Sequence, residues 1–174
     1  MKGKGADPMD PEKLLKRSLE LGASAAKIVR SDAIVVSEWV RLKCQYGCNG
    51  YGKSLTCPPY SPTPSQMRNI LREYRWGILL SFEGHEANIH EIVSKLEAEA
   101  FLAGYYKAFG FGAGPCPFCE KCNLEDCIHP QKARPSMEAC GIDVYTTARG
   151  AGFQLEVIRS RDERPRYFAL VLIE

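Results

Sequence analysis

The fold is decided by residues 78–111, which read ILLSFEGHEANIHEIVSKLEAEAFLAGYYKAFGF. Ile78 to Phe82 is a short apolar run that predicts a buried strand, and apolar residues then recur at helical spacing from Ile89 to Ala100. Gly104 ends the predicted helix, and Tyr105 to Phe111 predicts the next strand. The order strand, helix, strand indicates a right-handed βαβ unit.

The chain before this unit predicts two helices separated by an irregular loop. Asp10 before Pro11 is a capped helix start. Short strands or extended segments are expected at 25–29 and 34–36, where small and β-branched residues gather. Glycine and proline punctuate residues 44–64, which predicts a loop suited to wrapping an inorganic centre. Thr63-Pro-Ser-Gln66 is a capping box for the second helix.

The C-terminal part predicts a closing hairpin. Its strands are expected at Gln154 to Arg159 and Arg166 to Ile173, and the stretch from Tyr167 is apolar on both faces, as in a central strand. Ser136 and Asp143 are expected to cap short helices. The whole predicts a single α+β domain over residues 11–174 after a disordered extension, 1–10. We expect a small mixed sheet with the cysteine-rich loops at its edge.

Composition limits the possible functions. A chain of 174 residues can build a hydrophobic core without metal or disulfides. No secretory h-region or membrane span is found, so we expect a cytoplasmic protein with reduced thiols. The formal charge of +2 argues against a protein devoted to coating nucleic acid. The 8 cysteines therefore need a chemical role.

Four of the cysteines form the most specific motif in the chain. Cys116, Cys119 and Cys122 are each separated by two residues, close to the spacing of bacterial iron–sulfur ferredoxins. Cys127 is the expected local fourth ligand, although it follows after four residues rather than three and no proline comes next. Zinc is the alternative, but its usual pattern is two Cys-x2-Cys pairs with a longer spacer. The motif favours iron–sulfur over zinc.

A second group lies upstream and is less complete. Cys44, Cys48 and Cys57 span a glycine-rich loop whose backbone N–H groups could hydrogen-bond cluster sulfides. The spacing differs from the Cys-x3-Cys-x2-Cys triplet of radical enzymes. Cys140 is either the fourth ligand or a small buried core residue, and in the second case one metal position stays open for water or substrate.

Other polar residues near these groups carry weaker signals. His129 follows Cys127 and is either a ligand or a packing residue, and solvated or capping roles are expected for His85 and His90. Three basic residues could offset the negative charge of a cluster or dock an acidic partner, namely Arg41, Lys43 and Lys53.

The chain resembles a prokaryotic family described as predicted metal-binding proteins, frequent in anaerobic bacteria and archaea. The resemblance rests on Trp39 to Cys44, Tyr51 to Tyr60, Gly114 to Pro130 and Ala133 to Val144, and it covers most of the chain beyond the N-terminal extension. It implies metal or iron–sulfur binding. It also implies that position 140 is commonly another residue, which favours a three-cysteine site at the upstream group.

These observations lead to one principal hypothesis and two alternatives. The chain is expected to hold one or two [4Fe–4S] clusters and to act in electron transfer or as a redox accessory, receiving electrons from a partner protein because no flavin or nicotinamide motif is present. One alternative is an enzyme that uses the open position of the three-cysteine group. The other is a zinc-stabilised interaction module. The sequence does not indicate an oligomeric state.

Overall fold

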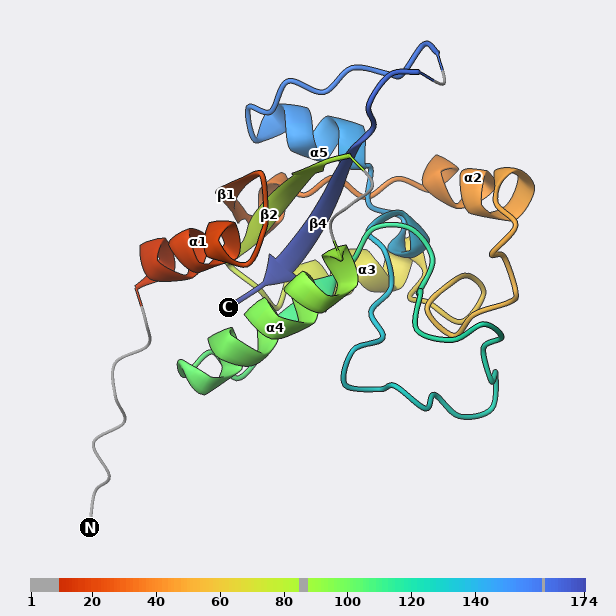
Figure 1. Cartoon of the computed structure of the whole chain (residues 1–174), viewed down its shortest axis with the longest axis horizontal. Coiled ribbons are helices and arrows are strands. Elements are labelled where there is room, and N and C mark those ends of the chain that lie inside the picture. Colours follow the sequence, from red (N-terminus) through yellow and green to blue (C-terminus); the bar gives the residue numbers. More distant parts are fainter. Residues whose placement is uncertain (1–9, 85–87, 161) are drawn as a thin grey trace.

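A four-stranded antiparallel sheet lies between two layers of helices in the computed structural model, which describes residues 10–84, 88–160 and 162–174 (Figure 1). The strand order is β1-β2-β4-β3, and every neighbouring pair is antiparallel. The strands are β1 (Ala25–Arg30), β2 (Trp76–Glu83), β3 (Phe109–Phe111) and β4 (Arg166–Leu172). The expectation of a mixed sheet was therefore wrong.

The predicted βαβ unit is present in a split form. Helix α4 (Ile89–Leu102) connects β2 to β3, but β4 lies between these two strands and pairs antiparallel with both. Since both are antiparallel to β4, β2 and β3 run in the same direction without touching. The C-terminal strand thus fills the position that a simple βαβ unit would give to β3.

The prediction of a C-terminal hairpin was also wrong, because β4 pairs with β2 and β3 instead of with the segment before it. Within the described residues, 154–159 form no strand, and both edges of β4 are occupied by β2 and β3. Phe153 and Leu155 are instead buried in the core, while 156–159 are exposed. The central position of β4 was predicted correctly: Phe168 and Leu170 face one apolar set, and Ala169 and Val171 face the other.

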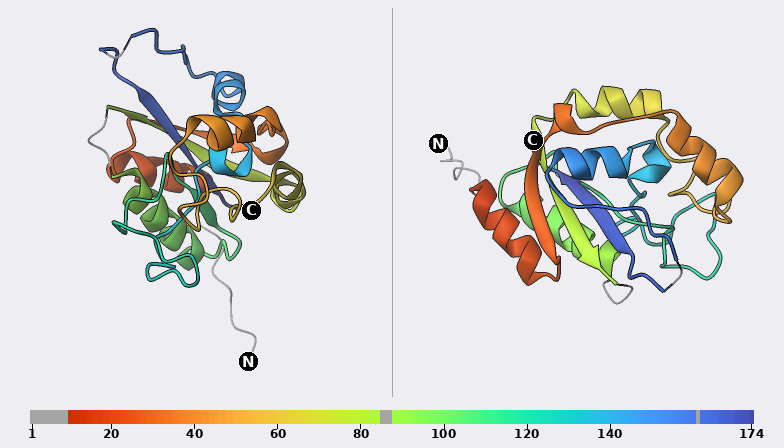
Figure 2. Two further views of the ribbon diagram at one scale, coloured as in Figure 1. Left: turned by 90° about the vertical axis from the view of Figure 1, so that its right-hand side faces the viewer. Right: turned by 90° about the horizontal axis from the view of Figure 1, so that it is seen from above.

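Helices cover both faces of the sheet (Figure 2). One face packs against α1 (Pro11–Glu20) and α4, and the other packs against α3 (Pro64–Leu71) and α5 (Val144–Gly150). Three of the four predicted caps are confirmed, whereas Met137 instead of Ser136 is the N-cap of the short helix at 138–140. The side chains of Asp10, Thr63 and Asp143 each accept a backbone hydrogen bond at the start of their helices, and Gln66 completes the capping box.

Two long loops meet at one end of this core. The segment between α2 (Trp39–Gly47) and α3 and the segment that follows edge strand β3 lie side by side on the right of Figure 1, and the left view of Figure 2 faces that end. These segments carry seven of the eight cysteines, together with the last turn of α2. Of the expected extension 1–10, residues 1–9 lie outside the described residues, as does His85.

Candidate metal centre

The upstream cysteines come from a helix and the loop after it. Cys44 lies in the last turn of α2 and Cys48 caps its end, so the predicted irregular loop starts later than expected. Arg41 explains why the helix persists: its guanidinium donates to the carbonyl oxygens of Pro62 (2.8 Å) and Ala139 (3.0 Å), which fastens α2 to the molecule. A helix therefore positions the first thiol of this group.

The glycine-rich loop brings its backbone up to two of these thiols. The N–H of Gly50 donates to Sγ of Cys48 at 3.4 Å. A Cβ placed on Gly50 would lie 3.5 Å from Sγ of Cys48 and 3.6 Å from Sγ of Cys57. The two thiols therefore flank a space that glycine leaves open. Backbone N–H donors of this kind tune the basicity of metal-bound sulfur.

The downstream cysteines surround a small cavity. Its volume is about 150 Å³, and Cys116, Cys119, Cys122 and Cys127 all line it. Burial raises the pKa of the Cys116 thiol, and the charges of the other three cysteines raise it further. The effect of the other three on Cys116 indicates that their sulfurs lie near it.

The two cysteine groups share one region, which the sequence did not predict. Residues 53–56 of the upstream loop line the same cavity as the four downstream thiols. The side chain of Pro115 lies 3.9 Å from a Cβ on Gly50, and the charge of Cys116 contributes to raising the pKa of Cys57, which burial raises most. Loops far apart in the sequence thus form one sulfur-rich end of the molecule.

All eight cysteines are free thiols. Among residues 10–84, 88–160 and 162–174, no three His, Cys, Asp or Glu side chains converge closely enough to hold a single metal ion. The four thiols of the downstream group line one shared cavity.

Cys140 lies away from solvent in the apolar core. Its side chain is fully buried, in the same apolar set as Met67, Met137 and Ile142. Burial raises the pKa of its thiol to about 12. These surroundings match the sequence alternative of a small core residue, since a metal ligand must be a thiolate.

Glu138 is a half-buried acidic residue that the sequence reasoning missed. Its carbonyl oxygen lies 3.9 Å from Sγ of Cys44, and its Oε2 is shielded from solvent without a hydrogen-bond partner among the described residues. Burial raises the pKa of its carboxyl group. An acidic residue between apolar Met137 and Ala139 was the signal in the sequence that could have drawn attention to it.

The downstream loop is anchored at its start by a buried histidine. His90 was expected to be solvated or to cap a helix, but it is 4% exposed. Its Nε2 lies 3.1 Å from the carbonyl oxygen of Ala113, and its ring meets that of Phe118 edge to face. A Cβ at Gly112 would come within 2.7 Å of this ring, so the close approach requires glycine. The ring of Phe118 also contacts that of His129, and both rings line the cavity.

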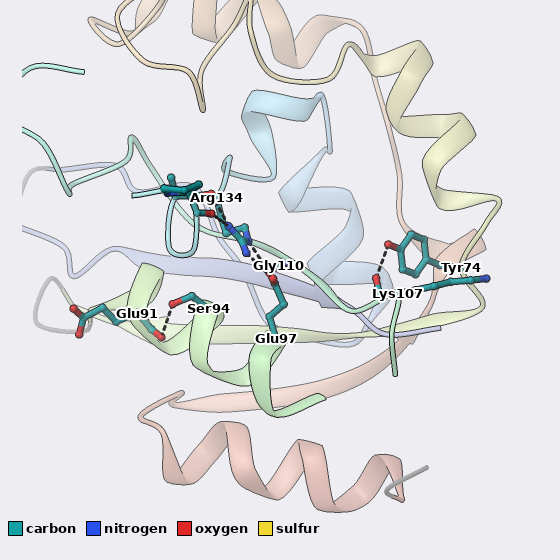
Figure 3. Close-up of polar contacts among 9 residues, drawn as sticks. Tyr74, Glu91, Ser94, Glu97, Lys107, Gly110 and Arg134 are labelled. Atoms are coloured by element: carbon teal, nitrogen blue, oxygen red, sulfur yellow. Dashed lines mark hydrogen bonds and ion pairs between the residues drawn. The ribbon is translucent and has the colours of Figure 1, made fainter. Parts of the chain in front are cut away.

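A buried ion pair anchors the end of the same loop (Figure 3). Arg134 donates two hydrogen bonds of 2.6 Å to the carboxylate of Glu97 on α4, and Glu97 also accepts from the N–H of Gly110 on β3 at 2.7 Å. The guanidinium stacks over Phe109 at 5.1 Å. Helix, edge strand and cysteine loop are thereby joined.

A larger apolar cavity adjoins the small one. Its volume is about 550 Å³, and its wall includes Tyr60, Tyr74, Phe109 and Phe111. Cys127 lines both cavities, and so do three of its neighbours, Leu55, Thr56 and Ala133. A molecule in the larger cavity would lie beside a thiol of the downstream group.

A metal fits the residues at this end. The donor set is thiolate-rich, Gly50 leaves room between two sulfurs, and a buried carboxylate oxygen lacks a partner among the described residues. Buried carboxylates are normally paired or bound to metal.

Comparison with known proteins agrees with this assignment. The model of the family described as "Predicted metal-binding protein (DUF2284)" matches residues 27–173. A search of the curated proteins gave no match, and neither did a search of the solved structures. No helix in the described part of the chain is long and apolar enough to cross a membrane.

Proposed function

The chain belongs to the family of predicted metal-binding proteins, and from this premise we propose that it is an iron–sulfur protein with one or two [4Fe–4S]-type clusters. Its role would be electron transfer, either on its own or as a redox accessory subunit. Cys116, Cys119, Cys122 and Cys127 hold one cluster. Cys44, Cys48 and Cys57 hold the other.

The observation that carries this proposal is the cavity of about 150 Å³ lined by four thiols. A single zinc ion needs four ligand atoms around one point, with each sulfur about 2.3 Å from the metal. In a cluster each thiolate binds a different iron, so the sulfurs enclose a volume. Four thiols around one shared cavity support the cluster.

Bound clusters would supply one-electron transfer, and the residues around them would hold and tune them. The N–H of Gly50 donates to one ligand sulfur, and the rings of Phe118 and His129 form part of the wall of the downstream cavity. The positive charge of Arg41 lowers the pKa of Cys44, against the dominant effect of burial, and Lys53 lines the shared cavity. Both charges favour the thiolate state that a metal requires.

The proposal includes a partner protein as the source of electrons. Arg41 and Lys53 lie at the sulfur-rich end, and Lys43 lies exposed on α2 beside them. A basic rim steers acidic surfaces toward it. We place the protein in the cytoplasm, where thiols stay reduced.

Metal and sulfide analysis tests this function. Protein purified without oxygen should contain iron and acid-labile sulfide in equal amounts, roughly four of each per cluster, and should give an electron-spin resonance signal when reduced. Cys119→Ser and Cys57→Ser should each remove one cluster if there are two. Zinc without iron or sulfide would contradict the proposal and favour a zinc-stabilised interaction module.

A second candidate function is an enzyme that exchanges electrons with a small uncharged aromatic molecule. The apolar cavity of about 550 Å³ favours it, because this volume is typical of ligand sites and Cys127 lies in its wall. Among the described residues that line this cavity, Arg134 is the one cationic side chain, and it is paired with Glu97. The cavity wall therefore offers no unpaired cation to bind an anionic ligand.

Ligand binding tests this second candidate. Calorimetry with 1,4-naphthoquinone should detect binding to the wild-type protein, and Ile70→Trp, which fills the cavity, should abolish it. Ile28→Trp is the control, since Ile28 is 39% exposed on β1. Equal binding by both variants would contradict this candidate.

A further inference from the structure

The three-cysteine group lacks a fourth protein ligand by sequence, and the structure brings two candidates to it. Both lie on the short 3-10 helix η2 (Glu138–Cys140), which packs against α2 beside Cys44. One is the thiol of Cys140 and the other is the carboxylate of Glu138. Their surroundings differ.

The surroundings of Cys140 suit an uncharged thiol that binds no metal. Its side chain is fully buried among apolar residues of the core, including Met67 and Ile142. A thiol needs no strong partner in such a place. To bind a metal it would have to lose its proton inside the core, which burial opposes.

Ser136 hydrogen-bonds the Glu138 carboxyl group, but one of its two oxygens is left without a partner in the described part of the chain. Its Oε2 is shielded from water and has no hydrogen-bond partner among the described residues, and no described cation pairs with it. The guanidinium of Arg41 lies beside the same element but donates to the carbonyl oxygens of Pro62 and Ala139. A buried carboxylate oxygen in this condition costs free energy unless a cation binds it.

Glu138 lies beside Cys44, the first thiol of the group, on an element that packs against α2. Its backbone carbonyl meets Sγ of Cys44, and its carboxylate charge contributes to raising the pKa of both Cys44 and Cys140, which burial raises most. Carboxylate oxygen is an ordinary ligand of zinc and of iron. The residue that carries the unpartnered oxygen therefore contacts one of the three thiols.

We propose that Glu138, through Oε2, is the fourth ligand of the metal centre held by Cys44, Cys48 and Cys57. This inference rests on the proposed function, because it assumes a metal at that group. A carboxylate oxygen is a harder ligand than a thiolate sulfur. The ligand at the position that Glu138 binds would therefore be replaced more readily than the three thiolates. The two cysteine groups would then hold chemically different centres.

Two matched substitutions test the inference. Glu138→Gln removes the charge at constant size, and Cys140→Ala removes the competing thiol. Both are made in the full chain with Cys119→Ser and Cys122→Ser added, so that the signal comes from the upstream group. The readouts are iron and sulfide content after anaerobic purification, the electron-spin resonance spectrum and the rate of metal loss to a chelator.

We expect Glu138→Gln to change the spectrum and to speed metal loss by at least about tenfold, whereas Cys140→Ala leaves both unchanged. Glu138→Asp should restore part of the retention. The metal-free Glu138→Gln protein should be at least as thermally stable as the unsubstituted one, because an uncharged amide replaces an acidic group whose charged form burial disfavours. A purely structural glutamate would instead lower stability in both the metal-free and the loaded protein.

The outcomes separate this inference from the proposed function. If the unsubstituted protein holds iron and sulfide but Glu138→Gln retains both with an unchanged spectrum, Glu138 is not a ligand and the function stands. The same holds if Cys140→Ala alone loses metal. If the protein holds zinc at the upstream group and Glu138→Gln releases it, Glu138 is a ligand and the iron–sulfur function is wrong. Absence of metal from the upstream group of the unsubstituted protein overturns the inference.

Discussion

Gly50 shows how a single backbone position can control metal loading. A methyl group on it would make ordinary contacts with the sulfurs of Cys48 and Cys57, at 3.5 and 3.6 Å, without a clash. Gly50→Ala should therefore fold normally while its side chain occupies the space between two ligand sulfurs. We expect metal retention at least about tenfold weaker, measured as iron content and rate of loss to a chelator.

Gly47→Ala is the matched control for this prediction. It places the same methyl group at the end of α2, where nothing lies within 4 Å. Normal retention is expected. If both alanine variants hold metal like the unsubstituted protein, the space beside Gly50 is not the metal position.

His90 makes the stability of the loop anchor depend on pH. Burial lowers its pKa below the ordinary 6.5, against smaller opposing effects of backbone hydrogen bonds. The unfolded chain then binds a proton more readily than the folded protein. The stabilising contribution is therefore complete above the ordinary pKa and is lost as the pH falls below it. The ring faces the Ala113 carbonyl, the backbone of Gly112 and the ring of Phe118, and no described acid pairs with it.

We expect the melting temperature of the metal-free protein to fall more steeply from about pH 7 to about pH 5 than that of His90→Phe, since histidine titrates in this range. Thermal unfolding at several pH values measures the difference. His129→Phe is the control, because His129 is only half-buried. Parallel pH profiles for His90→Phe and the unsubstituted protein would mean that His90 does not titrate on unfolding.

At the level of elements, the pair of Arg134 and Glu97 holds the cysteine loop to α4 and β3. The two side chains are only 11% and 14% exposed, so removing one partner leaves a poorly solvated charge. Glu97→Gln should cost about 3 kcal/mol of unfolding free energy, measured by denaturant titration of the metal-free protein. The double variant Glu97→Gln/Arg134→Met should recover part of this loss, since it removes both charges.

The exposed pair of Arg30 and Asp32 is the control for this prediction. Its side chains are 78% and 65% exposed, and such pairs contribute little. Asp32→Asn should leave the unfolding midpoint unchanged. A Glu97→Gln variant as stable as Asp32→Asn would show that the anchor is not needed by the fold.

For the molecule as a whole, local sequence signals predicted several elements but neither α2 nor the assembly. The segment expected as a strand at 34–36 forms only an isolated bridge at Val36. The apolar runs of β2 and β4, the capping box at Thr63 and the helix of α4 follow from patterns within a few residues, and all were confirmed. The insertion of β4 between β2 and β3 depends on pairing across the chain, which no local pattern encodes. The same reason hid the meeting of the two cysteine groups and the burial of Glu138 against Cys44.

The division between core and loops predicts what metal removal does to the whole protein. Neither apolar set of the core contains a described residue from 48–63 or 114–135. The sheet and its helices can therefore fold without metal. The stability of the two cysteine-bearing loops, in contrast, depends on the bound metal. A metal present at a hundred times its Kd adds about 2.7 kcal/mol to the opening free energy of the segments that bind it, which is about a hundredfold in amide protection. Hydrogen exchange should therefore show that metal-free protein loses protection in these two segments while β2 and β4 keep theirs. Equal loss in the two strands would mean that metal binding and folding of the core are coupled.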